Sequence, residues 1–328
     1  MTTQFRLIFP DYVRVSVLVL VIFLTGCIFV DFKPKELYQE KFISGNEKSV
    51  NKVLILPING IIMNEEAGGF FSKDACTPEK IREQLQLAGR DKDIKAIILE
   101  IDSPGGGVTA SDIIYQNIKE FKKQKPDLPI VVLMKDTAAS GGYYIAMAGD
   151  YIIAHRTSIT GSIGVISLFV IVEELLEKIK VDVEIIKSGE VKDMGSPFKK
   201  MSDKERELIQ SIVNEMYQRF VNVVVEGRKD VLTREEILKL ADGRVFTGQM
   251  AYDKKLIDAV GYLADAEKKA QEIAHLSDSK VIRYERVKSG LGAAFSLENP
   301  LGEINFLKQL VLRDGTSRFM YLWWPAGE

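Results

Sequence analysis

Two consecutive strand–turn–helix units in the first half of the chain leave little choice of fold class. Residues 96–101 form an apolar, β-branched run that predicts a buried strand, followed by a turn of three glycines and a helix over about 109–123. The next unit repeats this order, with a strand over 129–134, a turn of small residues over 138–142 and a helix to about 148. Strands that alternate with helices of this length pair in parallel, so the sequence predicts an α/β fold.

Further segments extend the same domain. We expect strands at 53–58, 60–62, 151–154, 164–166 and near Val245, and helices from Thr77, from Ser202, from Thr233 and over 264–274. Thr77 before Pro78, and Ser202 three residues before Glu205, are typical helix starts. An apolar stripe along the helix from Ser202 predicts contact with the core or with another subunit. No linker-like stretch interrupts residues 52–285, so we expect one domain there.

The N-terminus carries an apolar run over residues 15–30, behind Arg6 and Arg14. Its length lies between that of a signal-peptide apolar region and that of a spanning helix. Residues 24–27, Leu-Thr-Gly-Cys, resemble a bacterial lipobox, in which Cys27 would be acylated and become the mature N-terminus. An uncleaved signal anchor is the alternative, and either interpretation places the protein at the outer side of a membrane. The predicted division is a signal peptide or anchor over 1–27, a tether over 28–50, the main domain over 51–288 and an aromatic-rich extension over 289–328.

Composition excludes several classes of function. Lysine and arginine number 44 and aspartate and glutamate 46, which leaves a net charge of −2 without the basic stripe that nucleic-acid binding needs. Two cysteines and two histidines (His155 and His275) are too few for a disulfide framework or a four-ligand zinc site. Catalysis must therefore depend on other side chains, and we expect no metal site.

The two small-residue turns, over 102–107 and 136–142, are the candidate site. Each follows a buried strand and precedes a helix, which is where α/β sheets bind ligands. Ser140 lies at a predicted helix start, and the glycine turn opposite can offer exposed N–H groups. This arrangement is typical of a nucleophile beside an oxyanion hole. A plain helix cap is the alternative for Ser140. The residues alone leave its activating base open between His155 and a desolvated lysine.

Five segments, at 101–108, 138–145, 160–165, 187–197 and 244–251, resemble in order those of the signal peptide peptidase A family. The similarity covers roughly residues 50–285 and corresponds to the short bacterial form, with one copy of the catalytic region. It implies a Clp-protease-like (crotonase-like) fold of repeated strand–turn–helix units, preceded by the N-terminal signal or anchor segment. It also implies a membrane-bound Ser–Lys peptidase that degrades cleaved signal peptides, with its peptidase domain over 51–288.

Carried over residue by residue, the resemblance assigns the nucleophile to Ser140 and the general base to Lys192. Ser162 matches the serine that orients the lysine amine, and Gly106 with the N–H of Gly141 matches the oxyanion hole. The implied reaction is peptide hydrolysis through an acyl-enzyme, with no metal, nucleotide or organic cofactor. A turn hydroxyl at Ser162 and a solvated charge at Lys192 remain the plain alternatives.

The resemblance also implies partners and a location. We expect apolar peptide substrates such as signal peptide remnants, a membrane anchor, a homo-oligomeric ring and no nucleic acid, with the catalytic domain outside the cytoplasm in a bacterial cell envelope. We expect the aromatic C-terminus to pack either against its own body or against a neighbouring subunit, and the helix from Ser202 is a second candidate for subunit contacts. The alternatives are a peptidase of the same clan that processes one protein partner, an acyl-CoA enzyme on the crotonase fold, and a lipid-anchored scaffold without activity.

Overall fold

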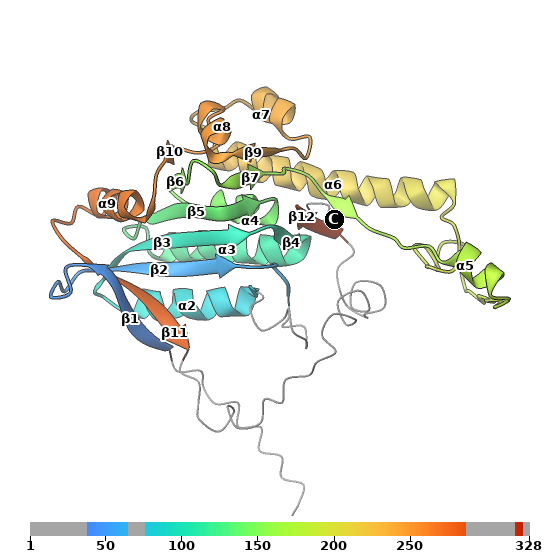
Figure 1. Ribbon diagram of the computed structural model, residues 1–328, viewed down its shortest axis with the longest axis horizontal. Helices are drawn as coiled ribbons and strands as arrows, with labels where there is room; N and C mark the ends of the chain where they lie inside the picture. The colour runs from blue at the N-terminus through green and yellow to red at the C-terminus, as the bar shows by residue number, and fades with distance from the viewer. Residues whose placement is uncertain (1–37, 65–75, 287–318, 324–328) are drawn as a thin grey trace, which may run out of the picture. The chain divides into compact units, whose positions relative to one another are not determined.

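The computed structural model describes residues 38–64, 76–286 and 319–323 (Figure 1). The chain divides into two units, and the smaller one, Met1–Tyr38 with Arg286–Ser296, lies almost entirely outside the described residues. The predicted lipobox with Cys27 lies outside them as well. Among the helices that are described, none is both long and apolar enough to cross a membrane. The fold below is that of the larger unit, Gln39–Glu285 with Leu297–Glu328.

The main sheet is largely parallel. Its order is β1 (Tyr38–Gly45), β11 (Lys280–Arg286), β2 (Lys52–Asn59), β3 (Ile94–Ser103), β5 (Ile130–Ala139), β6 (Tyr151–Ala154) and β10 (Ala259–Val260). All pairings from β11 to β10 are parallel. Two short strands continue the sheet beyond the β5–β6 pairing. β7 (Ile159–Gly161) pairs with the last residues of β5, and β9 (Val245–Thr247) pairs with β7. The predicted α/β fold with a parallel sheet is confirmed.

Helices cover both faces of this sheet (Figure 1). α2 (Pro78–Arg90), α3 (Val108–Gln124) and α4 (Gly141–Ala146) pack on one face, and α9 (Leu263–Ile273) packs on the other. Alternate residues of a strand point to opposite faces. Leu54 and Leu56 of β2 therefore join the core under α2 to α4, while Val53 and Ile55 join the core under α9.

The predicted helix starts are confirmed. The Thr77 side chain accepts a hydrogen bond from the Lys80 amide at the start of α2. Ser202 and Glu205 form a reciprocal capping box at the start of α6 (Asp203–Gly227). The later part of α6, with Phe220, is buried, whereas its first half is largely exposed and runs out to α5 (Glu173–Lys178) (Figure 1). Two short helices, α7 (Arg234–Leu240) and α8 (Gly248–Asp253), follow α6.

A second, three-stranded sheet was not expected from the sequence. It places β12 (Phe319–Leu322) between β4 (Gly105–Gly107) and β8 (Ile166–Ser167), antiparallel to both. β12 comes from the predicted C-terminal extension, just as β1 comes from the predicted tether. The strand expected over 164–166 is found as β8, which begins only at Ile166. This small sheet lies at the edge where β3 and β5 end, which is where the candidate site was predicted.

Candidate active site

Ser140 stands on a strained turn between β5 and α4. Its backbone angles are φ 51° and ψ −112°, a region that side-chain-bearing residues rarely occupy and that costs about 1–3 kcal/mol. The residue is only 1% exposed, and its hydroxyl makes no cap hydrogen bond to α4. Helix capping therefore does not account for a serine here. Strain of this kind concentrates at functional sites, since the surrounding structure must enforce it.

Ser162 lies next to Ser140 because β5 and β7 run parallel. Ala139 is paired with Gly161, and the Ser140 amide donates to the Gly161 carbonyl oxygen at 2.8 Å. Each serine thus follows a paired residue at the same edge of the sheet. Ser162 shares the left-handed backbone, with φ 50°, and its amide donates to the Arg244 carbonyl oxygen at 2.8 Å. The structure brings these two predicted residues together.

The glycine turn after β3 lies against the Ser140 turn. Gly105 has φ 98°, and a Cβ atom added to it would stand 2.7 Å from the Gly141 amide nitrogen. A Cβ on Gly141 would stand 3.2 Å from the Gly105 Cα, and one on Gly106 would stand 2.0 Å from the Ile62 carbonyl oxygen. A side chain is therefore excluded at Gly105 by the Gly141 amide and at Gly106 by Ile62. The contact between Gly105 and Gly141 brings the turn that holds Gly106 next to the turn that holds Ser140.

The C-terminal strand β12 runs directly past these turns. Tyr321 is in register with Gly106, and the Trp323 amide donates to the Pro104 carbonyl oxygen at 2.8 Å. The Tyr321 carbonyl oxygen would be 2.0 Å from a Cβ on Gly105 and 3.2 Å from one on Gly141. A main-chain carbonyl of the protein itself thus lies against both turns.

An aromatic cluster holds β12 in place. The fully buried Tyr321 ring stacks on Tyr144 of α4, with centroids 5.1 Å apart, and contacts Phe220 of α6 at 4.7 Å. Its hydroxyl donates to the Met216 carbonyl oxygen at 2.8 Å. The aromatic C-terminus was expected to pack against its own body or a neighbouring subunit. Residues 319–322 pack against their own body, beside α4.

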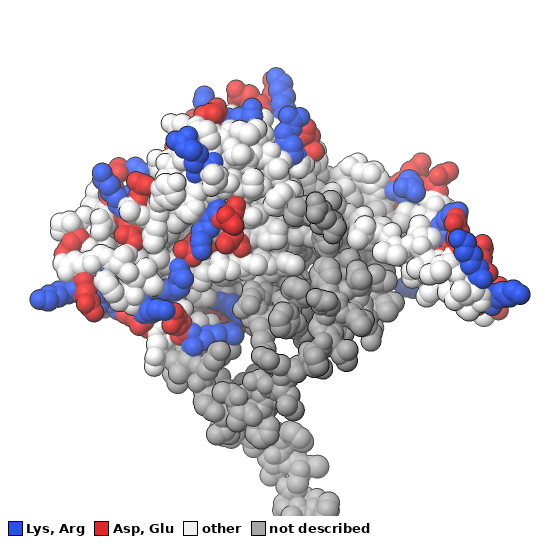
Figure 2. Space-filling view, viewed as in Figure 1, with Lys and Arg blue, Asp and Glu red and all other residues white. Residues whose placement is uncertain are grey.

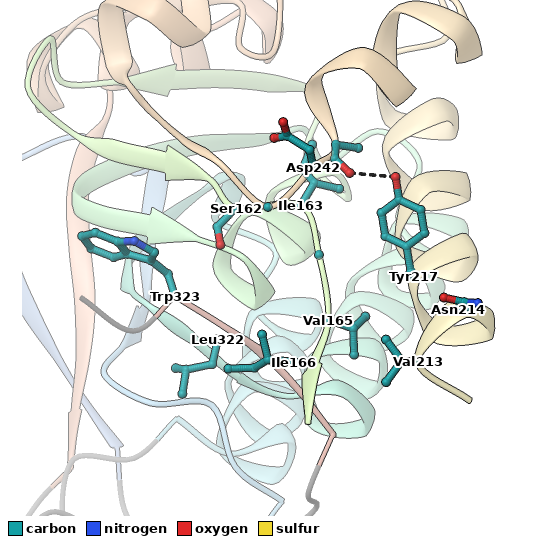
Figure 3. A pocket seen from close by; sticks show the side chains of 13 residues that line it. Ser162, Ile163, Val165, Ile166, Val213, Asn214, Tyr217, Asp242, Leu322 and Trp323 are labelled. Carbon is teal, nitrogen blue, oxygen red and sulfur yellow. Dashed lines mark hydrogen bonds between the residues drawn. The ribbon is translucent and has the colours of Figure 1, made fainter. Parts of the chain in front are cut away.

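Beside Ser162 the surface opens into a hollow of about 520 Å³ (Figure 3). Ser162 and Trp323 lie on one side of it, and Asn214 and Tyr217 of α6 lie on the other. The Tyr217 hydroxyl donates to the Ala241 carbonyl oxygen at 2.7 Å, which ties α6 to the loop before β9. The hollow gives a route from solvent to Ser162.

Lys192 does not lie with Ser140 in the single chain. It is exposed, in a turn where its amide donates to the Gly189 carbonyl oxygen at 3.1 Å. It lines a separate hollow of about 620 Å³ with apolar residues that include Met194 and Ile209. Figure 1 shows the segment between α5 and α6 at the N-terminal end of α6, whereas α4 lies against the sheet near the other end. Neither Ser140 nor Ser162 lines the hollow that holds Lys192.

His155, the other base that the residues left open, lies elsewhere. It follows β6, and its ring packs against Tyr262 with centroids 4.9 Å apart. It lines neither of the two hollows described above. The structure therefore gives His155 no place at the site.

The segment that leads to Lys192 leaves many apolar side chains uncovered. We call residues 166–186 the apolar arm, because large hydrophobic residues are exposed along it, up to 93% for Ile186. The others are Ile166, Leu168, Val170, Ile171, Leu175, Ile179, Val181, Val183 and Ile185. Figure 2 shows uncharged surface beside the charged side chains at this end of the molecule. Continuous apolar surface of this kind is typical of a contact with a partner.

Comparison with known proteins agrees with the geometry. Residues 121–277 match the model of peptidase family S49. A putative signal peptide peptidase SppA of Enterococcus faecium is 37% identical over 285 residues, which cover 87% of this chain and 81% of that protein. A putative protease of Methanocaldococcus jannaschii is 37% identical over 216 residues, or 65% of this chain and 68% of that protein. Protease 4 of Haemophilus influenzae is 33% identical over 225 residues, which cover 69% of this chain but only 35% of that protein.

Among solved structures, a membrane-bound stomatin-specific protease aligns over 67% of this chain and 84% of its own, at 18% identity and a TM-score of 0.44. The family matches show that the protein is a serine-type peptidase. More narrowly, the chain belongs to peptidase family S49. The resemblance to the signal peptide peptidase A family is thereby confirmed, and so is the α/β fold that it implies. The acyl-CoA enzyme and the inactive scaffold are not supported.

Some features of the site had no clear sequence signal. The position of Tyr321 beside the glycine turn depends on a pairing with residues more than 200 positions earlier in the chain. The left-handed backbone of Ser162 could have been suspected from its place, because Gly161-Ser162 follows a short β-branched run much as Ser140 follows β5. In the glycine turn after β3, Gly105 has a positive φ.

Proposed function

We propose that this protein is a membrane-associated endopeptidase that hydrolyses extended apolar peptides, signal peptide remnants among them. The observation that carries the proposal is the position of β12. An extended segment lies there as an antiparallel strand between β4 and β8, directly beside the turn of Ser140. Strand addition of this kind is how many clefts bind extended peptides, through main-chain hydrogen bonds. A substrate that takes the place of β12 would have its backbone against both glycine turns.

In this proposal Ser140 is the nucleophile. Its Oγ attacks the scissile carbonyl, and the N–H groups of Gly106 and Gly141 stabilise the oxyanion that forms. The contact of the Tyr321 carbonyl oxygen with the Gly105 and Gly141 turns supports this assignment, because a peptide carbonyl is accommodated at the same point. The peptide C–N bond then breaks, which leaves an ester on Ser140 and releases the amine.

Lys192 is the proposed base, and we assign it to a second copy of the chain. Its neutral amine would take the Ser140 proton, pass it to the leaving amine, and then activate the water that hydrolyses the ester. Lys192 and Ser162 line different hollows of one chain, and the hollow beside Ser162 offers a lysine from a neighbouring molecule a path to the serine pair. Ser162 would then orient the incoming amine.

The apolar arm supports this assembly. Its exposed side chains flank the segment that bears Lys192, so a contact that buries them would carry the lysine into a neighbouring subunit. Such a contact would also exclude water from the amine, and an apolar environment favours the neutral form that a lysine base requires. A homo-oligomer would therefore bury the apolar arm and also bring a neutral Lys192 amine to the serine pair.

Membrane association rests on the N-terminal sequence. We propose that residues 1–27 are either a signal peptide that ends in a lipidated Cys27 or an uncleaved anchor, with the peptidase domain outside the cytoplasm in a bacterial envelope. The mass of the native N-terminus distinguishes the two, since lipid on Cys27 and an intact Met1 exclude each other. An unprocessed, unlipidated chain in the soluble fraction would overturn the membrane proposal.

The decisive test of the chemistry is hydrolysis of a quenched apolar peptide by the full-length chain in mild detergent. We expect Ser140→Ala and Lys192→Ala each to abolish turnover, and Ser188→Ala, a nearby loop serine, to retain it. An equimolar mixture of the two inactive variants should recover activity, because some interfaces then pair an intact serine with an intact lysine. Activity in Ser140→Ala would overturn the nucleophile, and activity in Lys192→Ala would overturn the base. Two inactive variants that fail to complement would place the dyad within one chain.

Substrate class is tested with the same enzyme. Faster cleavage of apolar than of polar peptides of equal length supports clearance of signal peptide remnants. Cleavage confined to one folded protein would instead favour a dedicated processing peptidase.

A further inference from the structure

The turn that bears Lys192 is fixed by a buried carboxylate. The side chain of Asp193 is only 9% exposed, and its Oδ1 lies 2.8 Å from the Lys187 Nζ and 3.3 Å from the Lys199 Nζ. Lys187 also donates to the Glu190 carbonyl oxygen at 2.8 Å. One carboxylate thus ties together both ends of the segment 187–199, with Lys192 between them.

The same ion pairs fasten this segment to α6. The Lys199 Nζ lies 2.6 Å from Oε1 of Glu205, whose side chain is 2% exposed. The other oxygen of Glu205 accepts hydrogen bonds from the amide and hydroxyl of Ser202, which caps the helix. A continuous chain of charge-assisted contacts therefore runs from the Lys192 turn to the rigid first turn of α6.

Lys192 differs from Lys187 and Lys199 in its ion pairs. Within the described residues, Lys187 and Lys199 both have carboxylate partners, and Lys192 has none. The contacts of Asp193 with its two neighbours also hold the pKa of its carboxyl below the ordinary value. The Asp193 carboxylate thus pairs with Lys187 and Lys199, while the Lys192 amine between them has no ion pair in the described residues.

We propose that Asp193 is a positioning residue for the reaction, which fixes the Lys192 turn on α6 so that the amine enters the neighbouring site in one orientation. This inference rests on the proposed role of Lys192 as the base. Catalysis by a base depends on its placement, and a displacement of about 1 Å costs on the order of 100-fold in rate. The large apolar side chains of the apolar arm are exposed, so they do not fix that placement by packing within one chain.

The test compares Asp193→Asn with Glu190→Gln in the full-length protein. Asparagine keeps the shape of Asp193 but cannot neutralise two ammonium groups, and Glu190 is a 73% exposed acid in the same turn that serves as the matched control. We expect Asp193→Asn to lower kcat on the order of 10- to 100-fold with KM within about twofold. Glu190→Gln should leave both constants near those of the parent, since an exposed ion pair contributes little.

The pH profile separates positioning from a loss of folded protein. Without the Asp193 anion, Lys187 loses its carboxylate partner, while Lys199 keeps Glu205. The added positive charge near the base favours its neutral form and moves the acid limb of kcat/KM to lower pH. Lys187→Met removes a cation instead and should move the limb to higher pH. A purely structural defect would scale activity at every pH without shifting the limb. Near-UV circular dichroism monitors the fold, and Asp193→Glu, which restores the charge, should recover part of kcat.

Two outcomes would overturn the inference. The first is an Asp193→Asn variant with the kcat of Glu190→Gln, and the second is a fall in kcat with an unshifted acid limb and no recovery in Asp193→Glu. If Asp193→Asn does not fold, Lys187→Met alone decides. An acid limb of kcat/KM that does not move to higher pH in Lys187→Met then overturns the inference. Failure of the proposed function is distinguishable, because it would show as activity in Lys192→Ala whatever the Asp193 variants do.

Discussion

Alanine at Gly105 is the sharpest perturbation of the site that the structure suggests. Gly105 has φ 98°, and an added Cβ would stand 2.0 Å from the Tyr321 carbonyl oxygen and 2.7 Å from the Gly141 amide nitrogen. Both neighbours are main-chain atoms, so neither can rotate away as a side chain would. Either β12 or the first turn of α4 has to move.

The magnitude follows from these two obstacles. A left-handed backbone costs an alanine about 1–2 kcal/mol, which should lower the free energy of unfolding by about that amount. Displacement of the Gly141 N–H removes one of the two proposed oxyanion donors, which should cost about 3–4 kcal/mol in the transition state, or roughly 100- to 1,000-fold in kcat. Loss of β12 alone would not rescue the variant, because the overlap with Gly141 remains. Gly105→Ala should therefore stay slow even when residues 319–328 are removed.

The assay is steady-state hydrolysis of a quenched apolar peptide, together with urea unfolding of the full-length chain. Gly107→Ala is the control two residues away, because its φ is −61° and its Cβ would meet nothing closer than the Ala110 Cβ at 3.8 Å. We expect its kcat to stay within about twofold of the parent, since 3.8 Å is an ordinary van der Waals contact. The reasoning is refuted if Gly105→Ala keeps its kcat, or if the two variants are equally slow.

Three further predictions concern β12, the α4 network and the Lys192 turn. Deletion of residues 319–328 should lower KM for peptides about tenfold or more at unchanged kcat, because a tethered competitor acts at millimolar effective concentration; an unchanged KM would contradict this. Tyr144→Phe removes the hydrogen bond that the Tyr144 hydroxyl donates to Asp112, so the free energy of unfolding in urea should fall by about 1–2 kcal/mol. An unchanged free energy of unfolding would show that this hydrogen bond does not stabilise the fold. The contact with Lys187 lowers the pKa of the Asp193 carboxyl. The stabilisation from this ion pair is therefore complete above the ordinary aspartate pKa of about 4, and it is lost as the pH falls through the lowered pKa of Asp193. Limited proteolysis of the segment 187–199 should accelerate only below about pH 4, and equal cleavage at pH 3 and pH 6 would show that the ion pairs do not hold the turn.

The elements that sequence predicts well are those with strong local signals. The buried runs over 96–101 and 129–134 became β3 and β5, and the caps at Thr77 and Ser202 begin helices where expected. The turn of Ser140 was also predicted, because its small residues lie between a buried strand and a helix. In each case the apolar pattern and the capping residue are close together in the chain.

The placement of Lys192 and of β12 follows from contacts that local patterns do not contain. β12 is four residues long and owes its position to Tyr321 packing on Tyr144 and Phe220, which a propensity cannot report. Lys192 was identified through its motif alone, which says nothing of how far the apolar arm carries it from Ser140. The capping box at Ser202 predicts where α6 begins, but not that its first half extends beyond the core.

The exposed first half of α6 and the apolar arm have a consequence for when the enzyme can act. If each site takes its lysine from a neighbour, a newly made chain is latent, and hydrolysis begins only at the density at which copies meet. Confinement to a membrane surface favours such encounters, whereas dilution in detergent would silence the enzyme without unfolding it. The requirement for a neighbour would then work as a safeguard, which keeps stray single molecules from cutting the polypeptides around them.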